Sequence, residues 1–253
     1  MQTLTVTGKR KDLRRFLHLA MNPKKDEEGK QDMLDANQFI PMPESLNIEC
    51  GSRDIVYEVW YGNIDKVKGY KWVPEEIKGD REKLKEFFRK EYKEADVLAD
   101  QYKFNMDNYG CKSWWDWCCR HWGSKWNFCD IYINAKGKPL EEPYKDFEDE
   151  LVYWFNSAWS PMCPVIYKMG EMFPDLKFEL EYEEPGFDFA GTFVMENGEN
   201  TVDDCHPYIS DDEEEEIVTT EEDLAPRYER LGKEKRSISN SSYGTKEGIV
   251  NIP

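Results

Sequence analysis

The hydrophobic and polar positions near the start of the chain follow two different periods. Residues 3–7 read T-L-T-V-T, and this alternation predicts a strand with Leu4 and Val6 facing inward. Over residues 9–21 the apolar side chains recur at helical spacing, with Lys and Arg on the opposite face. The pattern therefore predicts a strand and then an amphipathic helix, which Asn22-Pro23 ends.

The middle of the chain indicates a helical stretch followed by another strand. Alternation in D-I-V-Y-E-V-W-Y predicts a strand at 54–61, and helical spacing predicts one helix from Pro74 to about Tyr102. Ser113 is placed to cap a short helix that ends at Gly123. Residues 125–134 alternate again, which predicts a strand.

The next part of the chain predicts strands on both sides of a helix. We expect a strand at 150–156, a helix at 164–172, and a hairpin whose strands cover 177–182 and 187–195. Glu184-Pro185-Gly186 provides the tight turn of that hairpin.

The order of these elements predicts an α+β fold. When residues 44–110 are set aside as a large, mostly helical insertion, the rest runs strand, helix, two strands, helix and hairpin. That is the order of a ferredoxin-like split β-α-β antiparallel sheet with one extra strand. We expect this domain over residues 1–197. Residues 198–253 are expected to form an acidic, polar, flexible C-terminal tail, with D-D-E-E-E-E at 211–216.

The charge balance disfavours nucleic acid as the partner. The formal net charge is −18 and the pI is about 4.7, whereas binding to phosphates needs clustered Lys and Arg. No segment reaches the roughly 18 to 20 apolar residues of a membrane helix, so we expect no membrane contact and a cytoplasmic location. Seven cysteines, an odd number that includes the adjacent Cys118 and Cys119, favour free thiols over disulfides.

The tryptophan-rich stretch at 111–130 is the main candidate for a binding site. Trp122, Trp126 and Trp159 suit a pocket for a planar ligand, and Lys125 between two of them suits a phosphate. The same rings also suit the core between sheet and helices, and we favour that interpretation while the first stays open. The sequence G-S-K-W is not a glycine-rich phosphate loop.

Metal binding and catalysis find little support in the sequence. Cys118 and His121 would share one helix face, as zinc ligands can, but no C-x-x-C pair accompanies them, so we expect no metal and no cofactor. No residue set combines a nucleophile, a base and an orienting group, so no catalytic residue is assigned. Glu183 and Glu184 would point to opposite faces of a strand, and Glu184 suits the turn.

Several spaced motifs resemble the YubB / Api92-like ferredoxin-like domain family. The stretch W-W-D-W-C-C-R-H-W-G-S-K-W-N resembles its N-W-G-T-K-W-N signature, and F-N-S-A-W-S-P-M-C-P resembles its T-A-W-S-P-P element. F-P-D-L-K-F-E-L-E-Y-E-E-P-G-F-D-F-A-G resembles its closing strand, hairpin and strand, and N-Q-F-I-P-M-P-E resembles its F-x-x-I-x-P-M-P stretch. The resemblance spans residues 37–195 and departs from the family at His121, Ser124 and Met162.

The resemblance implies an accessory protein of a phage or conjugative plasmid, which acts in the cytoplasm of the bacterial host. We expect a non-enzymatic protein that binds a host protein or a small ligand, for example as a host-defence antagonist. The alternative is a nucleic-acid-binding protein that stacks bases on aromatic residues of the sheet. The candidate contact residues are Trp122, Lys125, Trp126, Trp159 and Glu184. The oligomeric state stays open.

Overall fold

The computed structural model describes residues 1–253 except 26, 28, 30, 141–144 and 210–253. Its strands are β1 Gln2–Thr7, β2 Cys129–Ala135, β3 Lys138–Pro139, β4 Glu150–Asn156, β5 Lys177–Glu184, β6 Phe189–Glu196 and β7 Glu199–His206. Its helices are α1 Arg10–Ala20, α2 Ile55–Trp60, α3 Arg81–Glu91, α4 Ala95–Tyr109, α5 Trp114–His121 and α6 Cys163–Met172. The described residues divide into a larger unit, Met1–Tyr182 with Thr192–Asp203, and a smaller unit, Glu183–Gly191 with 204–209.

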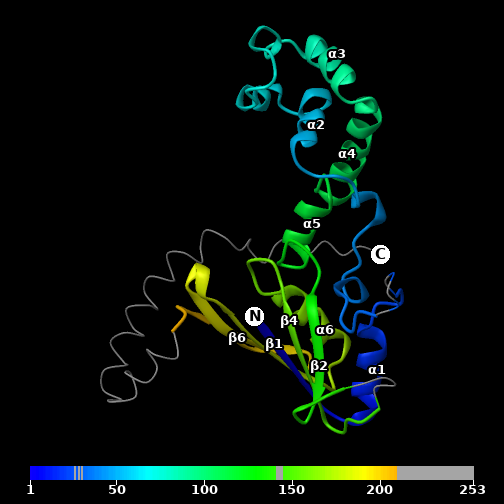
Figure 1. Ribbon diagram of the computed structural model, residues 1–253, viewed down its shortest axis with the longest axis vertical. Coiled ribbons are helices and arrows are strands. Elements are labelled where there is room, and N and C mark those ends of the chain that lie inside the picture. Colours follow the sequence, from blue (N-terminus) through cyan, green and yellow to red (C-terminus); the bar gives the residue numbers. More distant parts are fainter. Residues whose placement is uncertain (26, 28, 30, 141–144, 210–253) are drawn as a thin grey trace. The chain divides into compact units, whose positions relative to one another are not determined.

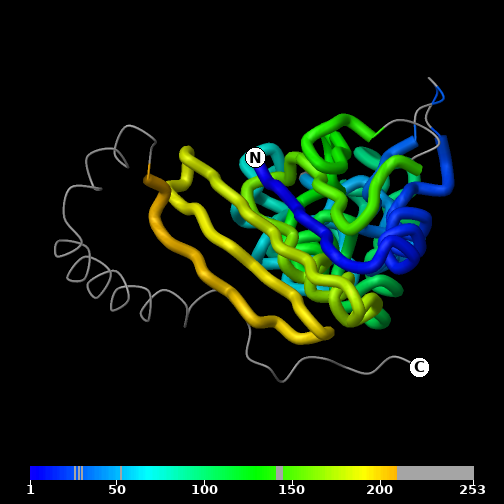
Figure 2. Tube along the Cα trace, turned by 90° about the horizontal axis from the view of Figure 1, so that it is seen from below, coloured from blue at the N-terminus to red at the C-terminus, as the bar shows by residue number. Residues whose placement is uncertain are grey.

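The strands form one sheet in the order β3-β2-β4-β1-β5-β6-β7 (Figure 1). The N-terminal strand β1 lies inside the sheet, antiparallel to β4 on one side and to β5 on the other (Figure 2). Strand β2 pairs antiparallel with β4. Leu4 and Val6 are fully buried, so the orientation that their alternation predicts is confirmed.

One face of the sheet is buried beneath α1 and α6. Phe16 of α1 lies edge-on to Tyr153 of β4 and to Phe178 of β5, with ring centroids 6.1 and 5.2 Å away. Helix α6 packs closely on β6, because a Cβ added at Gly170 would lie 2.6 Å from the Cβ of Met195. Phe173, directly after α6, also lies edge-on to Phe16 with ring centroids 5.5 Å apart, which brings the end of α6 next to α1.

The opposite side of the sheet is more exposed, and we call it the open sheet face. The strand register places Tyr132 of β2, Trp154 of β4, Thr3 of β1 and Glu181 of β5 in one row across it. Tyr132 is 71% exposed, whereas Trp154 and Thr3 are half-buried. The row therefore runs from an aromatic pair to a carboxylate.

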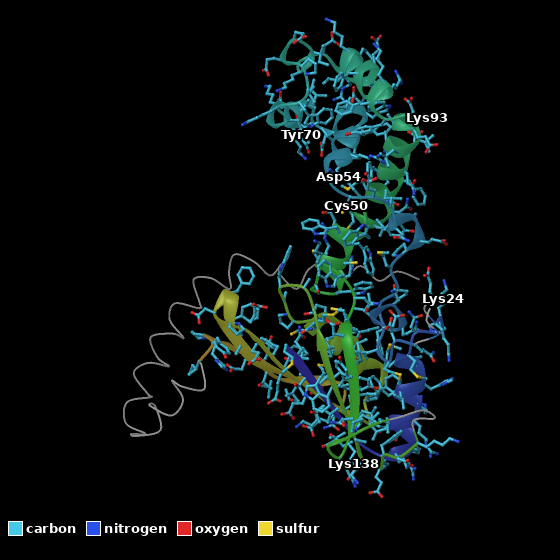
Figure 3. The ribbon with its side chains drawn as sticks, in the orientation of Figure 1. Lys24, Cys50, Asp54, Tyr70, Lys93 and Lys138 are labelled. Atoms are coloured by element: carbon cyan, nitrogen blue, oxygen red, sulfur yellow. The ribbon has the colours of Figure 1, made fainter. Side chains whose placement is uncertain are left out.

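The insertion predicted at 44–110, which lies between α1 and β2, is helical, as predicted, and has a hydrophobic core of its own. Figure 3 labels Cys50, Asp54, Tyr70 and Lys93 in this part of the chain. The core collects apolar side chains of α2, α3, α4 and the segment between α2 and α3: Ile55, Val56, Val59, Val67, Val73, Leu84, Phe88, Ala95 and Ala99. Burial of these residues stabilises the insertion.

The strand predicted at 54–61 is wrong, because this segment forms the helix α2. Its apolar residues Ile55, Val56 and Val59 satisfy helical spacing as well as strand composition, and all three are buried. A pattern this short fits both periods, and the contacts with α3 and α4 decide between them. The single helix predicted from Pro74 to Tyr102 is also wrong, since α3 and α4 separate at residues 92–94.

Strand β7 lies in the range that the sequence analysis treats as tail. It reads E-N-T-V-D-D-C-H, and all of its residues before His206 are exposed. No alternation of apolar residues marks such a strand, because its place at the sheet edge depends on backbone hydrogen bonds. The acidic block at 211–216 lies outside the described residues.

Two carboxylates of the insertion, four residues apart, have opposite pKa shifts. Burial raises the pKa of Asp54 above its ordinary value. Burial acts the same way on Glu58, but hydrogen bonds from Lys66, from the backbone N–H of Asn63 and from Lys112 outweigh it and lower the pKa. The stability that Glu58 contributes is therefore present at neutral pH and lost as the pH falls through its lowered pKa. The contribution of Asp54 is present in acid and lost as the pH rises through its raised pKa.

We expect Glu58→Gln to lower the free energy of unfolding by about 2 kcal/mol at pH 7, because the two lysines lose a charged acceptor. Asp54→Asn removes a half-buried charge, so it should raise the free energy of unfolding at pH 7 by up to about 1 kcal/mol and change it less at pH 4. Urea unfolding followed by circular dichroism at both pH values measures these effects. Changes of the same sign for the two variants at pH 7 would contradict the assignment.

Candidate functional site

Two loops, one after α5 and one after β4, are joined through Ser124. Its buried hydroxyl accepts a hydrogen bond from the backbone N–H of Ala158 at 3.0 Å and donates to the carbonyl of Ala158 at 3.4 Å. Gly123, at φ 76°, allows the close approach, since a Cβ there would lie 2.9 Å from the Cδ of Pro164. The residues that follow Ser124 therefore lie next to those that follow Ala158.

We name Lys125, Trp126 and Trp159 the indole clamp. The Nζ of Lys125 lies 4.8 Å from the ring centroid of Trp126 and 5.0 Å from that of Trp159, so the two centroids are within about 10 Å of each other. An ammonium at these distances is attracted by both indole rings. Trp126 is 45% exposed and Trp159 is 58% exposed. The structure thus brings three of the predicted contact residues together on the surface.

The lysine of the indole clamp has no ion pair within the described part of the chain. Lys66 and Lys103 of the insertion, by contrast, each contact a carboxylate, at 2.8 and 2.7 Å. The Lys125 ammonium instead contacts the two indole rings. Its charge is therefore available to an anionic group of a binding partner.

The backbone of Trp159 is strained. Its φ of 62° lies in the left-handed region, which a bulky L-residue occupies at a cost of about 1–2 kcal/mol. The neighbouring hydroxyl of Ser157 donates to the carbonyl of Ser160 at 2.5 Å and closes the turn. The chain thus holds a large apolar ring in a strained turn and leaves it exposed, and neither feature favours folding.

Trp122 lies in the core, apart from the clamp surface. It is 3% exposed, and its Nε1 donates to the carbonyl of Ile40 at 2.9 Å. Its ring lies edge-on to Trp117, with centroids 5.5 Å apart. Of the three tryptophans that the sequence analysis groups together, one fills the core and two are exposed.

The candidate zinc ligands Cys118 and His121 contact Met42 and Trp117, respectively. Cys118 is buried with its Sγ 3.9 Å from the Sδ of Met42, and burial raises the pKa of its thiol to about 12, which disfavours the thiolate that zinc requires. His121 stacks on Trp117 with centroids 4.6 Å apart, and burial lowers its pKa. Among the residues that the structure describes, no group of three or more His, Cys, Asp or Glu is arranged to hold a metal ion.

Glu184 lies in the smaller unit, at the turn between β5 and β6. Its carboxylate accepts a hydrogen bond from the backbone N–H of Gly186 at 3.3 Å, and Pro185–Phe187 form a 3-10 turn behind it. An acidic side chain that bonds to the backbone two residues on favours a tight reversal. The hydrogen bond between Glu184 and Gly186 agrees with the turn that Glu184-Pro185-Gly186 predicts.

A surface hollow of about 420 Å³ is lined by Thr7, Gly8, Lys136, Asp149 and Glu150. Lys136 is held there by Asp149, with the Nζ 3.5 Å from a carboxylate oxygen. None of the predicted contact residues lines this hollow. The candidate site is therefore the open surface of the indole clamp.

The side chains along β2 do not follow the strict alternation predicted over residues 125–134. That alternation would put Phe128 and Tyr132 on the same side, but Phe128 is buried and Tyr132 is exposed. The cause is an irregularity between Cys129 and Tyr132, where Asp130 has a φ of 53°. In addition, β2 begins at Cys129 and not at residue 125.

The role of Ser124 can be tested by removing its hydroxyl. Ser124→Ala leaves the backbone N–H of Ala158 without its partner, so the free energy of unfolding should fall by about 1–3 kcal/mol. Ser124→Thr keeps the hydroxyl and serves as the control. Urea unfolding of both variants measures the difference, and equal stability of the Ala variant and the wild type would contradict this role.

These features define the class of protein. It is an α+β protein with a seven-stranded antiparallel sheet, and its N-terminal part is largely helical. Within the described ranges, no helix combines the length and the apolar character needed to cross a membrane.

Comparison with known proteins agrees with this class. Residues 140–223 match the family described as the ferredoxin-like domain in Api92-like protein. Residues 140–223 therefore resemble the ferredoxin-like domain of the Api92-like family, and over this segment the resemblance seen in the motifs is confirmed. A similar solved structure is that of a protein Api92 from Yersinia pseudotuberculosis, at 10% identity and a TM-score of 0.40, covering 83% of this chain and 97% of that chain. No curated protein matches the chain.

Proposed function

We propose that the chain is a non-enzymatic binding protein whose indole clamp anchors a partner protein. The observation that carries the proposal is Trp159, which combines a left-handed backbone with a 58% exposed ring. Strain of this kind concentrates at functional sites. Tryptophan is also the residue type most enriched among those that dominate protein–protein binding energy.

The clamp also determines the chemistry of the partner. Lys125 has no described carboxylate partner, and the rings of Trp126 and Trp159 present apolar surface on either side of it. The matching surface carries a carboxylate next to an apolar or aromatic side chain. A small ligand is the alternative partner for the same two rings. Small-ligand sites are mostly concave, so the exposed rings of the clamp favour a protein partner.

The biological setting is proposed from the motifs of the chain. The tryptophan-rich stretch resembles a family that occurs on phages and conjugative plasmids. We assign the chain an accessory role for such an element, in which it binds a host protein, for example a component of host defence. This role requires recognition and no catalytic group.

We also infer that the ferredoxin-like fold includes the N-terminal elements. In this assignment β1-α1-β2 and β4-α6-β5 are the two interleaved halves of a split β-α-β sheet, with α2 to α5 inserted between α1 and β2. The strand order β2-β4-β1-β5 supports it, because two such halves interleave in this way. The indole clamp then lies where the chain enters β2 and leaves β4.

A second candidate function is base stacking on the open sheet face. Tyr132 and Trp154 lie directly opposite each other on β2 and β4, as aromatic residues that stack bases do. The same row ends at Glu181, and both this carboxylate and the net charge of −18 repel phosphates. We therefore place this function second.

Affinity capture from a bacterial host lysate tests the proposed function. We expect a protein captured by the wild type to be lost with Trp126→Ala and retained with Phe104→Ala, which removes a similarly exposed ring (51%) from α4. Capture of the same proteins by both variants would contradict the proposal. Release of the captured material by nuclease would support the second candidate in its place.

A further inference from the structure

Helix α1 presents a continuous basic face on the side away from the sheet. Its buried apolar side comprises Leu13, Phe16, Leu17 and Ala20. At 3.6 residues per turn, the exposed basic residues fall within an arc of about 140° on the other side. They are Arg10, Lys11, Arg14, Arg15 and His18.

These cations are only partly neutralised within the described residues. Arg15 contacts Asp12, the one acidic residue of α1, at 3.7 Å, and Asp12 is itself buried. Arg10 donates to a backbone carbonyl, which leaves its charge unpaired. Lys11 and Arg14 have no ion pair and no side-chain hydrogen bond to any described residue. At least three full positive charges therefore face outward without a described counter-ion.

This basic face contrasts with the rest of the chain. The sequence has 52 acidic and 34 basic residues. Other exposed lysines have acidic neighbours in the sequence: Lys90 precedes Glu91, and Lys93 precedes Glu94. Helix α1 instead collects its cations on one side, so the local charge of this face is opposite in sign to the net charge.

The chemistry of the basic face of α1 fits a phosphate backbone. Three of its residues are arginines, whose planar guanidinium groups bind phosphate through two parallel hydrogen bonds. No exposed aromatic side chain accompanies them on α1, whereas the centres of protein interfaces are rich in aromatic residues. The apolar side of the helix is buried in the core, so it is not free to enter a lipid bilayer.

We propose that the basic face of α1 binds the phosphodiester backbone of nucleic acid without reading its sequence. The helix has 11 residues and is therefore about 16 Å long, enough to reach several phosphates. Repulsion from the acidic remainder limits the contact to this face and makes it strongly dependent on salt. The inference uses no residue of the indole clamp, so it stands independently of the proposed function.

Fluorescence anisotropy with a labelled DNA duplex of about 20 base pairs tests the proposal on the full chain. We expect binding at about 50 mM salt that weakens steeply as salt is raised. The double variant Lys11→Glu, Arg14→Glu should weaken binding at least about tenfold and reduce the slope of log K against log salt by about two, one for each lost phosphate contact. Both side chains are exposed, so the unfolding curve should match the wild type.

The matched control is Lys90→Glu, Lys93→Glu, which makes the same change of net charge in the insertion (Figure 3 labels Lys93). Retention of wild-type affinity within about threefold by this control supports a local site on α1. Equal loss in both double variants, or no wild-type binding at about 50 mM salt, would overturn the proposal. Binding to vesicles that contain phosphatidylglycerol without binding to DNA would also overturn it.

Discussion

Trp159→Asn is expected to remove partner binding while leaving the fold as stable as the wild type, or up to about 1 kcal/mol more stable. At a φ of 62°, asparagine is tolerated better than a bulky residue. The ring that is lost is 58% exposed, so little buried apolar area is given up. An anchoring tryptophan contributes about 2 kcal/mol or more to an interface, so the affinity should fall by about 30-fold or more.

Urea unfolding and affinity capture of the same preparation measure both effects. Trp159→Phe is the control, since it keeps an aromatic ring and also keeps the backbone strain, and it should retain part of the binding. A fall of more than about 1.5 kcal/mol in the free energy of unfolding of the Asn variant would show that the ring has a structural role. Unchanged capture by that variant would exclude Trp159 from the interface.

Phe16→Ala should lower the free energy of unfolding by about 3–5 kcal/mol, because a fully buried ring leaves a cavity beneath α1. Phe16 contacts rings from three other parts of the chain: Phe39 before the insertion, Tyr153 and Phe178 of the sheet, and Phe173 after α6. Its loss therefore weakens the contact of α1 with both the sheet and the neighbouring segments.

Thermal and urea unfolding measure this effect, with Phe104→Ala as the control for an exposed ring. The control should change the free energy of unfolding by less than about 1 kcal/mol. Similar losses for the two variants would contradict the assignment of Phe16 to the core. If the Phe16 variant expresses only as aggregates, Phe16→Leu keeps most of the volume and should lose less stability.

The predicted secondary structure is correct where the spacing of the apolar residues fits only a strand or only a helix. In β1, residues Leu4 and Val6 alternate with threonines and face the core, and the apolar positions of α1 allow only a helix. Segment 54–61 satisfies both periods, and its contacts within the insertion make it helical. Strand β7 has almost no apolar residue to mark it.

The site was less predictable, because it depends on backbone conformation. The sequence brings Lys125 and Trp126 together, but Trp159 joins them only through the hydrogen bonds between Ser124 and Ala158. The positive φ of Trp159 and Asp130 leaves no signature in a sequence, since glycine and asparagine are the usual residues there. The large size of a tryptophan side chain favours a place in the core. Trp122 lies there, whereas Trp126 and Trp159 are exposed.

Hydroxyl-radical footprinting of the tagged chain, exposed once in buffer and once in host lysate before re-isolation, tests the indole clamp most directly. The rate of oxidation at Trp126 and Trp159, each measured relative to the similarly exposed Trp72 of the insertion, reports whether the clamp is covered. We predict that both clamp tryptophans are protected in lysate while Trp72 is not. Equal oxidation of the clamp in buffer and in lysate would contradict its assignment as the partner-binding site.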